Sequence, residues 1–99
     1  MKLTEEQIEK LLVLFAKEYK KTQDEAEKYI SQGGVKPNEV VFDVTDVGGS
    51  DIRFVISDAL EEFEKRGVVE SYWIAGVGEG AAFFTDEGLK ILDEKENDI

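Results

Sequence analysis

A glycine-rich turn between two apolar segments is the feature that most constrains how this chain can fold. Residues 68–75 are rich in Val, Tyr, Trp and Ile, which favour β-strands, and residues 81–84 form a shorter segment of the same kind. The turn between them, residues 76–80, has glycine at every second position. Because so short a connection can join only antiparallel strands, we predict a β-hairpin. By strand alternation, one of Tyr72 and Trp73 should face outward from it.

A helix is predicted on each side of this hairpin. Before it, residues 51–66 carry apolar side chains every three or four positions, and the basic pair that precedes Gly67 is typical of a helix C-terminus. The predicted apolar face consists of Ile52, Ile56, Ala59, Leu60 and Phe63. After the hairpin, Thr85 followed by two acids predicts an N-cap. That last helix should run through Leu92, and residues 94–99 should fray. Its apolar positions are Leu89, Ile91 and Leu92.

The N-terminal third should begin with an amphipathic helix. Thr4 and Gln7 form a capping-box pattern, and apolar residues recur after them at helical spacing. These residues are Ile8, Leu11, Leu12, Phe15 and Tyr19. A second capping-box pattern at residues 22–25 predicts another helix, which Gly33-Gly34 should end. Its inward residues should be Ala26, Tyr29 and Ile30.

The residue types present exclude most catalytic chemistry. The chain has 99 residues, which suits one domain over residues 1–99, and it contains neither Cys nor His. Acids near Gly48-Gly49 match no calcium-loop spacing. The glycines of residues 76–80 precede a predicted strand, whereas a phosphate loop needs a helix there. We therefore expect no enzymatic activity, no metal site and no cofactor.

Negative charge dominates the second part of the chain. Lys and Arg total 12 and Asp and Glu total 23, so the formal net charge is −11. Residues 1–36 are neutral overall, and residues 37–99 therefore carry the whole excess. Such a surface repels nucleic acid unless a local basic patch overcomes the repulsion. The chain shows no signal-peptide pattern and no apolar run near the ~20 residues of a membrane span, so we expect a cytoplasmic protein without a membrane partner.

Three stretches carry a family resemblance. Residues 44–50 look like the end of a helix and a tight turn, and residues 56–69 look like a recognition helix that enters a first wing strand. Residues 84–92 look like a second wing strand followed by Thr-Asp-Glu-Gly and a last helix. Over residues 37–93 the chain resembles winged helix-turn-helix domains of bacterial and archaeal MarR- or PadR-like regulators. The resemblance implies an α+β fold, mostly helical with a small antiparallel hairpin as the wing, after an N-terminal helical extension at residues 1–34.

Residues 38–46 have two interpretations under this resemblance. The first helix of the motif would occupy them, whereas Val40, Val41 and Phe42 favour a strand by local propensity. Some winged-helix domains place at this point a short strand that pairs with the wing. The sequence leaves both interpretations open.

The resemblance also implies where a partner would bind. In winged-helix regulators the recognition helix enters the major groove and the wing approaches the backbone, and both need Lys or Arg. Here the outward side of residues 51–66 carries mixed, apolar or acidic residues: Arg53, Phe54, Ser57, Asp58, Glu61 and Glu62. The wing residues Val77, Gly78 and Glu79 add no positive charge. We therefore expect these residues to contact a basic protein partner, in a regulatory module of transcription or another nucleic-acid process.

Other hypotheses remain beside this one. Val13 and Leu14 make the first helix apolar beyond one stripe, so we expect a homodimer through it. The alternative function is a DNA-binding transcriptional repressor that acts as a dimer, with phosphate contacts from Lys10, Lys17, Lys21 and Arg53. A domain that senses a small effector between dimer helices is a third interpretation, which the sequence neither favours nor excludes.

Overall fold

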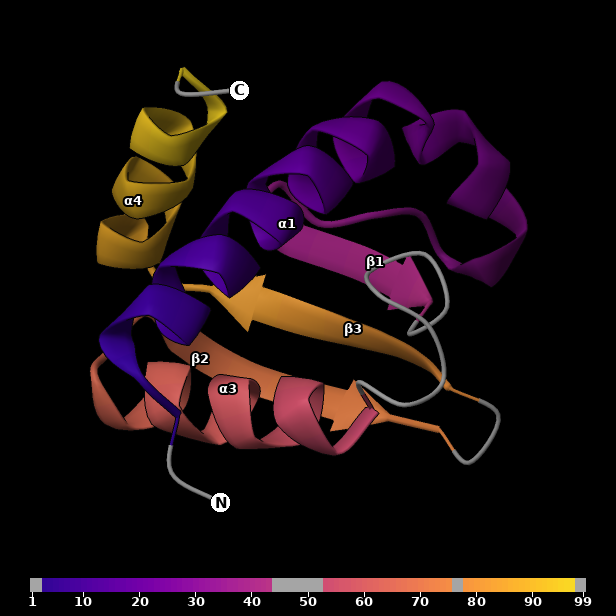
Figure 1. Ribbon diagram of the computed structural model, residues 1–99. Helices are drawn as coiled ribbons and strands as arrows, with labels where there is room; N and C mark the ends of the chain where they lie inside the picture. Colours follow the sequence, from indigo (N-terminus) through magenta and orange to yellow (C-terminus); the bar gives the residue numbers. More distant parts are fainter. Residues whose placement is uncertain (1–2, 44–52, 76–77, 98–99) are drawn as a thin grey trace.

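The computed structural model describes residues 3–43, 53–75 and 78–97, except for the side chains of residues 32 and 53–55. It shows an α+β fold in which α-helices cover one face of an antiparallel sheet (Figure 1). The sheet has three strands in the order β1-β3-β2, so β3 is central. In chain order, the elements are α1 (Glu5–Asp24), the 3₁₀-helix η1 (Ala26–Gln32), β1 (Glu39–Asp43), α3 (Arg53–Lys65), β2 (Val69–Ile74), β3 (Glu79–Phe84) and α4 (Asp86–Glu96).

Phe15 of α1 lies at the centre of the hydrophobic core and is fully buried. Its ring centroid is 5.6 Å from that of Phe42 on β1, 5.9 Å from Phe63 on α3 and 6.1 Å from Phe84 on β3. Edge-to-face and tilted ring pairs of this kind stabilise a core by about 0.5–1.5 kcal/mol each beyond the buried area. Leu92 of α4 joins the same cluster. The aromatic rings therefore join β1 and β3 of the sheet to α1 and α3.

Several predicted elements are confirmed. The two predicted hairpin strands are β2 and β3, which pair antiparallel, and residues 76–77 of the predicted turn lie outside the described residues. The capping box at Thr4 and Gln7 is present, and α1 buries the predicted apolar face except for Tyr19, which is half-buried. The hydroxyl of Thr85 accepts a hydrogen bond from the backbone N–H of Gly88, at 3.0 Å, and caps α4. The helix predicted at residues 51–66 is α3, whose described part begins at Arg53.

Residues 39–43 of the undecided stretch form a strand. β1 pairs antiparallel with β3, and Val40 and Phe42 point into the core. The β-branched and aromatic composition of this segment agrees with its position, because it has a partner strand to pair with and a core to fill. Residues 44–46 of the same stretch lie outside the described residues.

The second helix that the sequence predicts is present as the 3₁₀-helix η1, which ends before Gly33 as expected, but its predicted start at Thr22 is wrong. Thr22 does not begin a helix but lies buried in the last turns of α1, and the chain then forms the 3₁₀-helix η1. Ile30, which was predicted to face inward, is 71% exposed. Thr22 and Gln23 of the apparent capping box are used elsewhere, because their side chains hold the edge of β1. Gly33 ends η1 in the left-handed conformation, with φ +94°.

The predicted fraying is wrong for residues 94–96, because α4 continues to Glu96, and residues 98–99 lie outside the described residues. Ion pairs to α1 explain the extra turn: Lys95 pairs with Glu9, and Glu96 lies 3.7 Å from the ammonium of Lys20. β3 begins at Glu79, earlier than the predicted start at residue 81, so the hairpin turn is shorter than predicted. None of the described helices is both long enough and apolar enough to cross a membrane.

Candidate functional site: a groove on the outer face of the sheet

The face of the sheet that points away from the core carries its own set of side chains. Strand alternation sends Val40, Phe42 and Phe84 into the core and their neighbours to the opposite side, which we call the outer face. Register pairs place the outer-face side chains in three rows: Glu39, Phe83 and Ser71; Val41, Ala81 and Trp73; Asp43 and Glu79. The outer face is therefore aromatic and aliphatic in the middle and acidic toward one end.

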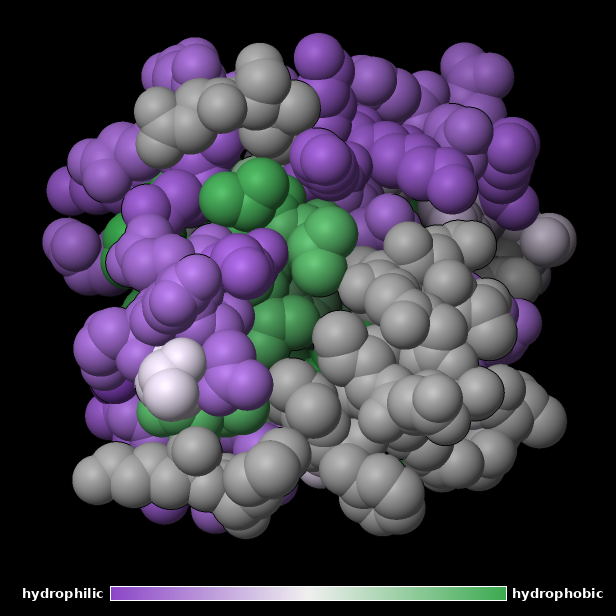
Figure 2. Space-filling view, in the orientation of Figure 1, coloured by the Kyte–Doolittle hydropathy of each residue, from purple (hydrophilic) through white to green (hydrophobic). Residues whose placement is uncertain are grey.

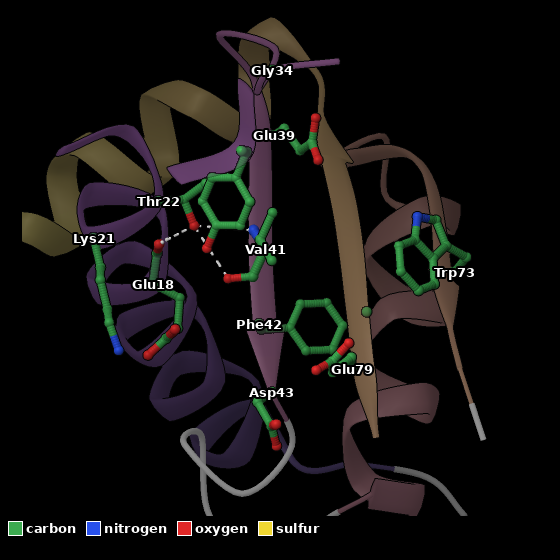
Figure 3. A pocket seen from close by; sticks show the side chains of 12 residues that line it. Glu18, Lys21, Thr22, Gly34, Glu39, Val41, Phe42, Asp43, Trp73 and Glu79 are labelled. Atoms are coloured by element: carbon green, nitrogen blue, oxygen red, sulfur yellow. Dashed lines mark hydrogen bonds between the residues drawn. The ribbon is translucent and has the colours of Figure 1, made fainter. Parts of the chain in front are cut away.

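A groove of about 500 Å³ runs over this face, and we call it the sheet-face groove (Figure 3). The sheet lines it with Val41, Trp73 and Glu79, α1 lines it with Lys21, and η1 lines it with Tyr29. Trp73 is 53% exposed, which is unusual for the largest apolar side chain. Figure 3 shows Trp73 on the β2 side of the groove and Lys21 on the α1 side. Aromatic surface is thus offered to solvent inside a concave site.

Hydrogen bonds from α1 fix the β1 edge of the groove. β1 is an edge strand, and the backbone groups of Val41 point away from β3. The hydroxyl of Thr22 accepts a hydrogen bond from the Val41 N–H at 3.0 Å and donates to the Glu18 carbonyl at 2.7 Å. The amide of Gln23 donates to the carbonyls of Lys36 and Glu39, each at 3.1 Å. These bonds satisfy groups that would otherwise be open for pairing with another strand.

Gly80 brings β2 and β3 close together beneath the groove. A Cβ atom at this position would lie 2.5 Å from the backbone oxygen of Trp73 and 2.7 Å from the ring of Phe42. Both distances are far below van der Waals contact, so only glycine fits without a shift of the strand. Gly80, which the sequence places in the hairpin turn, therefore has a packing role and helps to position Trp73.

Carboxylates dominate the charge of the groove. Glu18, Glu39, Asp43 and Glu79 line it, against the single ammonium of Lys21 among the described lining residues. No group of three or more metal-ligating side chains comes together in the described part of the chain. The negative charge is therefore spread along the groove, which suits an extended ligand with several positive groups.

The predicted partner surface on α3 is largely neutralised by the protein itself. Glu61 lies 3.6 Å from the ammonium of Lys65, and Glu62 accepts a hydrogen bond from Arg66 at 2.9 Å. Arg66 also donates to Glu5 at 2.6 Å, which lowers the pKa of that carboxyl and raises the pKa of the guanidinium. Lys65 pairs with Glu61, and Arg66 is shared by Glu62 and Glu5, so α3 offers less uncompensated charge than its sequence indicates.

The structure separates the other predicted contact residues. Ser57 is exposed on α3 and Asp58 is half-buried, whereas the side chains of Arg53 and Phe54 lie outside the described part, as does Val77. Gly78 is buried, and Glu79 belongs to β3 and lines the sheet-face groove. The predicted wing contact is therefore split between a buried position and the outer face.

The predicted lysine stripe lies along α1. Lys10 lies 3.5 Å from the carboxylate of Glu6, Lys17 is exposed, and Lys21 lines the sheet-face groove. In the region of this helix, Figure 2 shows an apolar patch with hydrophilic side chains along part of its border. Val13 and Leu14 are half-buried. Homodimerisation through α1 stays a prediction.

Sequence reasoning missed Tyr29, Glu39 and Asp43 as lining residues. The signal that could have found the two acids is the alternation in Glu-Val-Val-Phe-Asp, which places Glu39 and Asp43 on one face of a strand. That signal becomes useful only after the segment is assigned as a strand paired with β3.

No protein-family model, no curated protein and no solved structure matches this chain. The geometry of the described residues is therefore the basis for the function proposed below.

Proposed function

We propose that this protein is an interaction module that binds a basic polypeptide segment in the sheet-face groove. The observation that carries the proposal is the outer face itself, where the exposed Trp73 lies next to a row formed by Asp43 and Glu79. Tryptophan is enriched where proteins bind one another, because it buries a large area at little cost in conformational entropy. Carboxylates around it favour a partner of opposite charge.

The charge of the whole chain supports a basic partner. The net charge of −11 attracts cationic polypeptides over distances of about a Debye length, ~8–10 Å at physiological salt. Complementary charge mainly speeds association and selects the partner, while the buried aromatic contact slows dissociation. The groove provides both kinds of contact in one place.

The order of elements supports a winged-helix arrangement as the finer fold. A strand after the first helix, β1, pairs with the second strand of the hairpin, and α3 precedes that hairpin directly. In this proposal α3 corresponds to the recognition helix and β2–β3 to the wing. The setting is then regulation of transcription or another nucleic-acid process, in which the protein contacts a basic protein rather than the duplex.

Two double substitutions of equal charge change test the proposal. Glu39→Lys with Glu79→Lys reverses charge in the groove, and Asp58→Lys with Glu61→Lys reverses it on α3. Binding of a short fluorescein-labelled peptide of alternating lysine and glycine is measured by anisotropy at low salt. We expect the groove variant to bind about tenfold more weakly, because each exposed ion pair contributes about 0.2–1 kcal/mol and reversal also adds repulsion. The α3 variant should bind nearly as well as the native chain.

The opposite pattern would contradict the assignment to the groove. If the α3 variant alone lost binding, the partner surface would be α3, as the sequence indicates. If both variants lost affinity to the same extent, net charge alone would govern binding and the groove proposal would be wrong. If neither variant changed the affinity, the groove would not be the binding site. Circular dichroism of both variants checks that the fold is kept.

DNA binding is the second candidate function. The observation in its favour is the stripe of Lys10, Lys17 and Lys21, which follow one another at helical spacing along one side of α1. Anisotropy of a labelled random duplex at ~50 and ~200 mM salt tests it, because phosphate contacts make affinity fall steeply with salt. Salt-sensitive binding that alanine at these lysines reduces would support the repressor, and absence of binding at ~50 mM would exclude it.

A further inference from the structure

We propose that the open edge of β2 receives an extended basic segment of a partner polypeptide as a fourth strand of the sheet. The proposal goes beyond the function proposed above, because this edge is on the opposite side of the sheet from the β1 wall of the groove. Its basis is a contrast between the two edges. Side chains of α1 hydrogen-bond to the edge of β1, and no described residue does the same for β2.

The hydrogen-bonding pattern of the hairpin determines which backbone groups of β2 point to its open edge. The N–H of Ala75 donates to the carbonyl of Glu79 at 2.7 Å. Hydrogen-bonded and non-hydrogen-bonded pairs alternate along an antiparallel ladder. Trp73 therefore bonds to β3, whereas the backbone groups of Tyr72 and Ile74 point away from it. Within the described part of the chain, no other residue hydrogen-bonds to these outward groups, so a further strand can pair with them.

The usable part of this edge follows a β-bulge. The register between β2 and β3 shifts between Val69 and Ser71, and a bulge of this kind interrupts pairing. From Ser71 to Ile74 the register is regular. Ser71 and Trp73 are exposed, so solvent reaches this stretch. A regular, accessible edge is a template for another strand unless the protein covers it, as α1 covers β1.

The inner side of the edge, which faces α3, is negatively charged. Figure 1 shows α3 alongside β2. Burial, and then the nearby carboxylates of Glu64 and Glu61, raise the pKa of Tyr72, so both carboxylates lie near its side chain. Glu61 has the ammonium of Lys65 at 3.6 Å, whereas Glu64 is exposed and has no ion pair among the described residues. A strand residue opposite Tyr72 would point to the same side, where a basic side chain can reach Glu64.

The outer side of the edge is apolar. Trp73 points to the outer face and is 53% exposed. A strand residue opposite Trp73 would share that face, and a β-branched side chain there would cover part of the indole. The edge therefore fits a segment in which basic and β-branched apolar residues alternate. Such a segment would pair antiparallel, as every strand pair of this sheet does.

Charge favours a basic segment over a second copy of this chain at the edge. A second copy would bring another net charge of −11 and its own α3 carboxylates toward Glu64. A basic segment would instead neutralise that carboxylate, and its charge would speed association with the acidic chain.

N-methylated peptides test the proposal. In the antiparallel arrangement, the residues opposite Tyr72 and Ile74 are the basic ones, and their backbone N–H groups point to β2. A short fluorescein-labelled peptide of alternating lysine and valine is compared by anisotropy with two forms, N-methylated at the lysines or at the valines. We expect methylation at the lysines to weaken binding about tenfold, because it removes the donors that pair with β2. Methylation at the valines should change the affinity less than about twofold.

Amide hydrogen exchange of the native chain locates the added strand. The N–H groups of Tyr72 and Ile74 should exchange more slowly when the unmodified lysine–valine peptide is bound. The N–H of Trp73, which already bonds to β3, is the internal control and should change little.

A charge reversal on α3 tests the basic character of the segment. Glu64→Lys should weaken binding of the lysine–valine peptide about fivefold, because it replaces attraction by repulsion beside Tyr72. Glu94→Lys makes the same change of net charge at an exposed position of α4 and should have a smaller effect. Equal effects of the two variants would contradict the part assigned to Glu64.

The outcomes separate the edge from the groove. Glycine disfavours strands, so the lysine–glycine peptide that tests the groove is a poor ligand for the edge. In the groove variant Glu39→Lys with Glu79→Lys, methylation at the lysines should still weaken the lysine–valine peptide, and the edge then stands even if the groove fails its own test. Equal effects of the two methylations, or unchanged exchange at Tyr72 and Ile74, overturn the edge proposal. A native chain that sediments as a dimer and becomes a monomer with Ser71→Lys would assign the edge to a second copy and overturn it as well.

Discussion

The hydroxyl oxygen of Thr22 accepts a hydrogen bond from the backbone N–H of Val41 at 3.0 Å and joins the end of α1 to the open edge of β1. Thr22 is 2% exposed, so this bond lies away from water. A buried N–H that loses its acceptor keeps its full desolvation cost. The contact therefore stabilises the wall of the sheet-face groove as well as the fold.

Thr22→Val should lower the free energy of unfolding by about 1–3 kcal/mol, because it keeps the shape of the side chain and leaves the Val41 N–H unsatisfied. Urea denaturation measures the change, and amide hydrogen exchange at Val41 should become faster. Thr22→Ser is the control, since it retains the hydroxyl. Equal stability of the valine and serine variants would contradict the role of this bond.

Gly88→Ala should destabilise the protein, although alanine favours a helix over glycine by about 1 kcal/mol. A Cβ atom at this position would lie 2.0 Å from the carbonyl oxygen of Val68, so α4 would have to move away from the start of β2. We expect a net loss of about 1–3 kcal/mol, typical of an overpacked site, measured by urea denaturation. Asp93→Ala, at an exposed position of α4, tests helix propensity alone and should be neutral or stabilising. A stabilised Gly88→Ala would show that the approach to Val68 is looser.

The elements that local pattern specifies could be predicted from the sequence. The period of Ile8, Leu11 and Phe15 identifies α1, and the glycines between apolar segments identify the hairpin. The prediction failed at Thr22 and Gln23, because a capping-box pattern looks the same whether its side chains cap a helix or bind a strand distant in sequence. β1 stayed undecided for a related reason: its state depends on pairing with β3, about forty residues further along.

The candidate site depended even more on tertiary register. Alternation predicted that one of Tyr72 and Trp73 faces outward, and Trp73 does so while Tyr72 packs against the core. That Trp73, in the middle row of the outer face, lies next to the row of Asp43 and Glu79 follows from the strand order β1-β3-β2. No spacing along the chain encodes that order.

The ion pair between Glu5 and Arg66 should make stability depend on pH. The guanidinium holds the pKa of Glu5 below its ordinary value of 4.5 in the folded state. A carboxyl with a lowered pKa stabilises the fold above its unfolded-state pKa, and the contribution is lost as pH falls through the folded-state pKa. Glu5→Gln should therefore lower the melting temperature near neutral pH, and its difference from the native chain should vanish in acid.

Thermal unfolding of both proteins at pH ~7 and ~3 measures that difference. Glu6→Gln is the matched control. Glu6 pairs with Lys10 at 3.5 Å on the same helix, and both side chains of this pair are largely in water, so its loss should change the melting temperature less. A Glu5 difference that persists in acid would show that the carboxylate charge is not its cause.

Glu79→Gln should raise stability and weaken binding at the same time. Asp43 and Glu79 are register partners on the outer face, and like charges directly opposite each other destabilise a strand pair. Removing one of them should raise the free energy of unfolding by about 0.2–1 kcal/mol, more at low salt than at high salt. The same change should weaken binding of the lysine–glycine peptide, because it takes away one of the carboxylates that line the sheet-face groove. Glu70→Gln changes the net charge equally at an exposed position of β2 and should do neither. A Glu79→Gln variant that gained stability and lost affinity would mean that the sheet gives up stability to bind a cationic partner. A variant that lost both stability and affinity would contradict this view of the site.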